Sequence, residues 1–272
     1  MARGPLSRKL TAAGVFESAG ARVPYEIILE RRANTRYSLT QRKAYLRLPL
    51  RTSAAAIAKA RAEFEAWLGG ALAKRAGLRA AHEPRDFADG ETWHFGEHAF
   101  RLTIRRADVG GASARIQPHN RNGPGGNIDA VDAAPLLITL PQNLDPGASD
   151  EATEKLLFRM LARKVRPSVE REVRELNAAH FRIPVARVKL SATTSRWGSC
   201  SSSGTISLST RLAGVPAFCR KAVIVHELAH GIEMNHSPRF WSLVYGAMPD
   251  YDAADAWLKR EGGQLAWERV GR

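Results

Sequence analysis

Residues 226–230, His-Glu-Leu-Ala-His, constrain this chain more than any other segment. Two histidines four residues apart lie one above the other on the same face of a helix. Their imidazoles can converge on one metal ion, and Glu227 beside the first histidine can take a proton from a water molecule. A further histidine, His236, follows His230 by six residues. The pattern predicts zinc held by His226, His230 and His236 with one open position, as in catalytic rather than structural sites.

Residues 217–234 are predicted to form the helix that this chemistry requires. Apolar residues recur there at three- and four-residue steps: Phe218, Ala222, Val225, Ala229 and Ile232. Pro216 precedes them, where proline is tolerated at a helix start. Asn235 suits the left-handed conformation that ends many helices, and a turn there would bring His236 back toward the metal.

The third ligand has alternatives. Many zinc hydrolases use a later acidic residue, and the candidates are Asp250, Asp252, Asp255 and Glu261. His236 would then be an ordinary surface histidine. The spacing from His230 to His236 equals that of the metzincin pattern, but Glu233 stands where that pattern has glycine, so we do not assign the chain to the metzincins.

Four segments in this order resemble the YgjP-like metallopeptidase family, which is similar to the minimal zincins related to SprT and WLM proteases. They are Arg-Trp-Gly-Ser-Cys at 196–200, residues 204–208, the 226–230 motif, and Asn-His-Ser-Pro-Arg-Phe-Trp at 235–241. The resemblance implies an α+β fold in which the His-Glu-x-x-His helix packs on a small β-sheet. It also implies one zinc ion per chain, bound by the three histidines, with Glu227 as general base.

The expected activity is hydrolysis of peptide bonds in a peptide or protein substrate. A donor that stabilises the oxyanion would complete such a site, and the candidates are Arg196, Arg239 and Tyr245. Arg196 could equally be a structural anchor of its loop. Residues 205–209 are predicted to form a strand whose edge could pair with an extended peptide, while Ile206 and Leu208 face the core.

The net charge of +14 permits other functions. Residues 1–60 hold 12 Lys and Arg against 3 Asp and Glu, and such an excess attracts anionic partners. One alternative is therefore a metal-dependent nucleotide phosphohydrolase, and another is a basic nucleic-acid-associated protein whose metal serves folding. No helix-turn-helix or zinc-finger spacing accompanies the charge, so sequence-specific recognition is not predicted.

Two cysteines and the lack of a long apolar run predict a cytoplasmic protein that does not span a membrane. Cys200 could act as a nucleophile with a histidine, although metal binding explains the histidines better, and Cys219 is expected to be buried.

The predicted organisation has three parts. Residues 1–22 form a flexible basic lead-in. Residues 23–148 form an N-terminal α/β region rich in hairpins, with a long Gly-, Asn- and Arg-rich loop at 106–127. Residues 149–265 form the minimal zincin-like metallopeptidase domain. The fold class as a whole is α+β.

Overall fold

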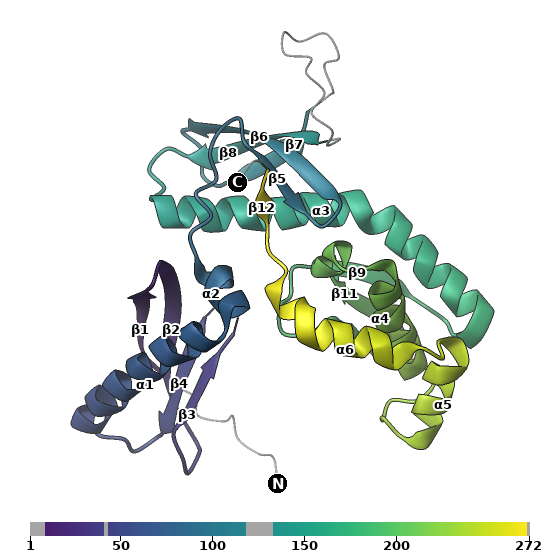
Figure 1. Ribbon diagram of the computed structural model, residues 1–272, viewed down its shortest axis with the longest axis horizontal. Helices are drawn as coiled ribbons and strands as arrows, with labels where there is room; N and C mark the ends of the chain where they lie inside the picture. Colours follow the sequence, from purple (N-terminus) through teal and green to yellow (C-terminus); the bar gives the residue numbers. More distant parts are fainter. Residues whose placement is uncertain (1–8, 41–42, 118–132, 271–272) are drawn as a thin grey trace. The chain divides into compact units, whose positions relative to one another are not determined.

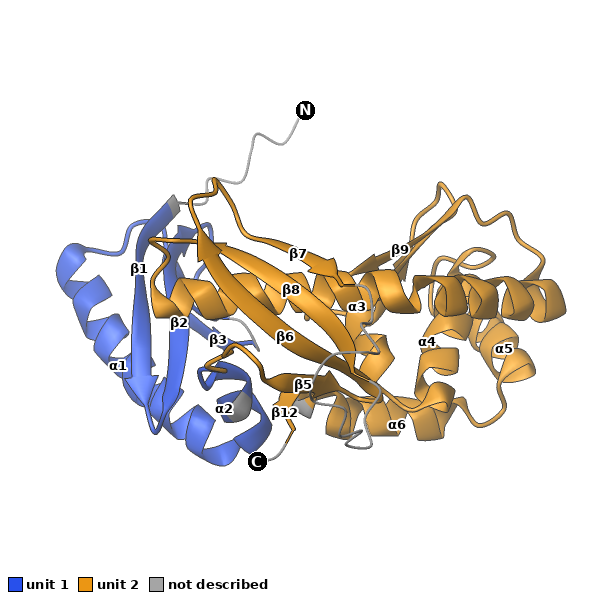
Figure 2. Cartoon of the chain, turned by 90° about the horizontal axis from the view of Figure 1, so that it is seen from above, with its two compact units in different colours: residues 1–84 blue, residues 85–272 orange. Residues whose placement is uncertain are grey.

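The computed structural model describes residues 9–40, 43–117 and 133–270. The chain divides into two compact units, residues 1–84 and 85–272 (Figure 2). Both units mix helices with small sheets, which confirms the predicted α+β class (Figure 1).

The first unit is a four-stranded sheet covered by a helix. Its strands are β1 (Lys9–Ser18), β2 (Ala21–Glu30), β3 (Arg36–Leu39) and β4 (Ala44–Pro49), in the order β1-β2-β4-β3. Alternate residues of β2 and β4 are buried, as expected for a sheet with one covered face. They pack on three buried residues of α1 (Ala54–Lys74), which are Phe64, Leu68 and Leu72.

Strand β1 covers residues 9–18 of the 1–22 segment that was predicted to be a flexible lead-in; residues 1–8 lie outside the described part. β1 pairs with β2 along nearly its whole length, from Lys9 opposite Leu29 to Ser18 opposite Ala21. The connecting residues Ala19 and Gly20 both have positive φ, 50° and 81°, as a tight two-residue hairpin turn requires. The strand was missed because its turn, Ala19-Gly20, lacks the Asn-Gly or Asp-Gly pair that most clearly signals a hairpin.

The second unit contains a five-stranded sheet on a long helix. The strands are β5 (Thr92–Phe95), β6 (His98–Ala107), β7 (Ser113–Ile116), β8 (Ala134–Pro141) and β12 (Glu268–Arg269), in the order β12-β5-β6-β8-β7. Buried residues of β5, β6 and β8 share one core with α3 (Pro146–Leu176). The structure thus joins residues 85–148 to the second unit, whereas the sequence had suggested a boundary at 148. Strand β7 also lies inside the predicted 106–127 loop, of which residues 118–127 are outside the described part.

The rest of the second unit carries the candidate site. A three-stranded sheet of β9 (Arg187–Ser191), β10 (Gly198–Cys200) and β11 (Thr205–Ser209) has the order β10-β11-β9. Three helices follow it: α4 (Ala217–His230), α5 (Pro238–Ala247) and α6 (Tyr251–Glu261). The His-Glu-x-x-His helix α4 packs on this small sheet and on α5 and α6, as the family resemblance implied (Figure 1).

The β1 pairing is testable at Gly14. A Cβ atom there would lie 2.7 Å from the Tyr25 ring, which is buried against Phe64. We expect Gly14→Ala to lower the free energy of unfolding by about 1–3 kcal/mol, because the packed ring cannot move away. Urea denaturation measures this change. In Gly70→Ala, whose Cβ meets nothing within 4 Å, the helix should gain up to about 1 kcal/mol. Equal stability of Gly14→Ala and wild type would contradict the pairing.

Candidate metal centre

Helix α4 is the scaffold of the site. Its residues Ala222 to Val225 and Leu228 to Ala229 are buried, so its position is set by the core. The helix begins after Pro216 and ends at His230, four residues earlier than predicted. Asn235 does not have the predicted positive φ; the chain leaves the helix through Gly231 in a right-handed conformation. The cause is local, because the amides of Ile232 and Glu233 both bond back to the Ala229 carbonyl.

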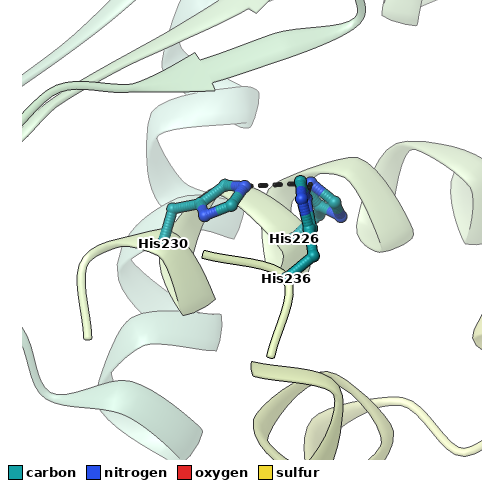
Figure 3. A group of neighbouring side chains, drawn as sticks. All are labelled: His226, His230 and His236. Carbon is teal, nitrogen blue, oxygen red and sulfur yellow. Dashed lines mark hydrogen bonds between the residues drawn. The ribbon is translucent and has the colours of Figure 1, made fainter. Parts of the chain in front are cut away.

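The three predicted histidines lie together, with their rings directed at a common point (Figure 3). His226 Nε2 is 3.2 Å from Nε2 of His230 and 3.2 Å from Nε2 of His236. Four tetrahedral ligands at zinc–nitrogen distances of about 2.1 Å would place their nitrogens about 3.4 Å apart. The donor set therefore fits a tetrahedral ion such as zinc, with room for one further ligand.

The imidazoles are held in the form that a metal needs. His230 Nδ1 donates to the Glu233 carbonyl at 3.2 Å, and His226 Nδ1 lies 3.0 Å from the Tyr251 hydroxyl. Such bonds at Nδ1 leave the Nε2 lone pair for a metal. Burial, and then the neighbouring His230 and His236, lower the pKa of His226 to about 4, and burial also lowers the pKa of His230. Both rings are thus neutral near pH 7, as metal ligands must be.

Two aromatic side chains, Phe240 and Trp241, pack against the histidine rings. Phe240 is fully buried, and its ring centre lies 4.9, 4.6 and 4.8 Å from those of His226, His230 and His236. Trp241 stacks on His236 at 5.9 Å. Packing of this kind fixes ring orientation, so the ligands need little rearrangement to bind.

Glu227 is buried beside the histidines and is 5% exposed. One carboxylate oxygen, Oε2, has no hydrogen-bond partner among the described residues. Burial raises the pKa of Glu227 to about 7, while the Arg196 charge and a backbone hydrogen bond from Cys200 act in the opposite direction. An unpartnered buried oxygen next to three neutral imidazoles is suited to receiving a proton from water.

Gly198 sets the position of this carboxylate. A Cβ atom at residue 198 would lie 2.5 Å from Glu227 Oε1, so only glycine permits the approach of β10 to α4. The neighbouring Trp197 is held between the Arg211 guanidinium, 4.8 Å from the ring centre, and the backbone of Gly262. Trp197 therefore anchors the start of β10, which keeps Gly198 next to Glu227.

The alternative acidic ligands do not join the histidines. Among the described residues, the group of side chains close enough together to hold one metal ion consists of the three histidines alone. Asp252 accepts a hydrogen bond from the Tyr245 hydroxyl at 2.9 Å, Asp255 pairs with Lys259, and Glu261 pairs with Arg260. Asp250 precedes α6 and is exposed.

The three candidate oxyanion donors differ in placement. Arg196 is exposed, yet its charge acts on Glu227 and so lies near the site. The Tyr245 hydroxyl donates a hydrogen bond to Asp252. Arg239 is exposed, and no contact with a histidine is found for it in the described part of the chain.

The thiol of Cys200 is a poor nucleophile, because burial and then Glu227 raise its pKa. Cys219 is buried, as expected.

Three contributors to the site were not assigned a role from the sequence: Tyr251, Phe240 and Gly198. Tyr251 lies 25 residues after His226, and no short motif links the two. Phe240 and Gly198 belong to segments that carried the family resemblance, but their roles depend on contacts that only the fold creates.

A mixed α+β domain in which a His-Glu-x-x-His helix carries three converging histidines defines a metallopeptidase-type hydrolase. The profile of the YgjP-like, metallopeptidase domain family matches residues 34–261. The chain belongs to this family. Among solved structures, the metallopeptidase zymogen abylysin of Pyrococcus abyssi is similar, with 19% identity and a TM-score of 0.32, over 36% of this chain and 99% of that one. No curated protein matches.

The Tyr251 contact predicts an effect on metal affinity. Removing the hydroxyl in Tyr251→Phe frees His226 Nδ1, and loss of such a partner costs about 10- to 100-fold in affinity. Zinc competition titration measures the change. Tyr245→Phe is the matched control, since its hydroxyl bonds Asp252 and should leave the affinity unchanged. Equal affinities in both variants would show that Tyr251 does not tune the site.

The Gly198 approach predicts an effect on turnover. Gly198→Ala should displace Glu227 and reduce turnover by about 10- to 100-fold, as misplacement of a reacting group by about 1 Å does. Zinc content should stay at the wild-type value, because the atoms nearest to the added Cβ belong to Glu227 and not to a histidine. The control is Gly246→Ala, whose Cβ would meet nothing within 4 Å. Full activity of Gly198→Ala would refute the assigned role.

Proposed function

We propose that this protein is a zinc-dependent peptidase that uses His226, His230 and His236 as ligands and Glu227 as general base. The observation that supports this most is the convergence of three Nε2 atoms, two pairs of them 3.2 Å apart, beside a buried carboxylate oxygen without a partner. Zinc bound there would act as a Lewis acid toward water and the substrate carbonyl.

The chain's own residues carry the proton. Glu227 takes it from the attacking water and delivers it to the leaving amine. A dication at the histidines favours the ionised, basic form of this carboxyl before the reaction. Arg196 is the best placed of the three candidates to stabilise the oxyanion, since its charge already reaches Glu227.

The strand that meets an extended substrate is β10. The sequence had suggested residues 205–209, which was wrong, because β11 is the central strand and pairs with both β10 and β9. Ile206 and Leu208 of β11 face the core as expected. β10 is an edge strand that packs on α4, so its free edge can pair with a peptide next to the histidines.

Phosphoanhydride hydrolysis is less well supported. A hollow of about 370 Å³ is lined by Arg166, Arg174 and Arg187, which could hold a phosphate, but none of the three histidines lines it. The hollow that does include His230 has no Lys or Arg among its lining residues. The charge excess of residues 1–60 therefore supports a general attraction to anions, while neither of these two hollows joins a cationic side chain to the histidines.

In the described part of the chain, no helix is long and apolar enough to cross a membrane.

The first test is metal content by mass spectrometry. We expect about one zinc per wild-type chain and almost none in His230→Ala. Glu227→Gln should keep its zinc and lose at least about 100-fold of peptide turnover, since general-base catalysis contributes about 100- to 10,000-fold. Absence of zinc from the reconstituted wild type would refute the hydrolase, and full activity of Glu227→Gln would refute its role as base.

A further inference from the structure

A hollow of about 560 Å³ opens beside His230. Two features border it: the end of β10 with the turn that follows, residues 200–204, and the segment after α4, residues 230–234. Its remaining wall is the 183–186 segment before β9. The hollow therefore adjoins the metal centre at His230 and the end of the strand to which we assign the substrate backbone at Cys200.

The lining combines apolar side chains with serine hydroxyls. Its apolar members include Ile183, Val185, Ile206, Ile232 and Met234, of which Ile206 is fully buried. The side chains at 201–203 are serines, and none of the described residues that line the hollow is Asp, Glu, Lys or Arg. A charged group entering this hollow would lose water without gaining a counter-charge, whereas an apolar group would not.

The hollow is preformed. Asn177 clamps Ile183 through two hydrogen bonds, donating to its carbonyl at 2.9 Å and accepting from its amide at 3.0 Å. Ile183 in turn rests against Gly231, where a Cβ atom would collide with it. The amide of Ala186 also donates a hydrogen bond to the Gly204 carbonyl at 3.0 Å, which joins the 183–186 segment to the turn between β10 and β11. Rigid walls of this kind are typical of ligand pockets.

We propose that this hollow is the specificity pocket and takes one bulky, uncharged, apolar side chain of the substrate polypeptide. The proposal rests on the proposed peptidase function and names its substrate class. A pocket of this size accepts leucine, methionine or phenylalanine. The zinc-loaded protein should therefore cleave peptides carrying such a residue near the scissile bond at least about tenfold more efficiently than matched peptides with Asp or Lys.

A binding measurement tests the pocket without catalysis. The chain has four methionines, of which Met234 is 55% exposed while Met160 and Met248 are buried. In zinc-loaded protein with labelled methionine methyl groups, the Met234 signal is assigned by its loss in Met234→Leu. It should shift saturably with N-acetyl-leucinamide and N-acetyl-phenylalaninamide, and not with the aspartate or lysine analogues. No shift with the apolar amides would overturn the pocket.

Cleavage of a mixed peptide pool supplies the second measurement. Met234→Glu should reduce kcat/KM for the apolar peptides at least about tenfold and improve the relative cleavage of lysine peptides. Phe218→Glu is the matched control, because Phe218 is also exposed, at 40%, but lies at the other end of α4 and should change nothing.

The outcomes separate the two proposals. Cleavage by wild type without apolar preference, or a preference that Met234→Glu leaves intact, overturns the pocket while the peptidase function stands. A saturable methyl shift with no cleavage of any peptide supports the pocket and overturns the peptidase function.

Discussion

The contact between Gly198 of β10 and the carboxylate of Glu227 is the constraint on which the site depends. It is close enough to exclude any side chain at residue 198. Because the carboxylate must sit there, β10 cannot shift along α4, and Trp197 holds it by packing between Arg211 and Gly262. The small three-stranded sheet thus positions one acidic group, and β10 at its edge packs directly on the helix that carries His226 and His230.

The electrostatics of the centre follow from the same burial. Removing His226 and Glu227 from water lowers the pKa of the imidazole to about 4 and raises that of the carboxyl to about 7. Both pKa shifts reflect the cost of burying a charged side chain. A dication bound between the histidines would offset that cost for the ionised carboxylate of Glu227. The unsatisfied carboxylate oxygen of Glu227 beside neutral imidazoles therefore favours metal binding, and the buried Phe240 packs against all three histidine rings.

The surroundings of the histidines also bear on the choice of substrate. The arginines that could receive a phosphate line a separate hollow against α3, while the space beside His230 is apolar. Net positive charge acts over long distances and attracts many partners. Specificity depends on the protein groups that lose their water when a substrate binds. The local lining therefore carries more weight than the overall charge of +14.

The sequence by itself determined that His226 and His230 face the same side of one helix, because residues four apart lie one turn above each other, and that Glu227 adjoins the first of them. Helical periodicity also placed Ala222, Val225 and Ala229 on the buried face of α4, whereas Phe218, from the same apolar pattern, is 40% exposed. Only the tertiary structure decided what depends on distant pairing. It joined residues 85–148 to the core of α3 and made β11 central rather than an edge. Tyr251 reaches His226, and Gly198 reaches Glu227, because packing brings together residues whose separation along the chain carries no periodic signal.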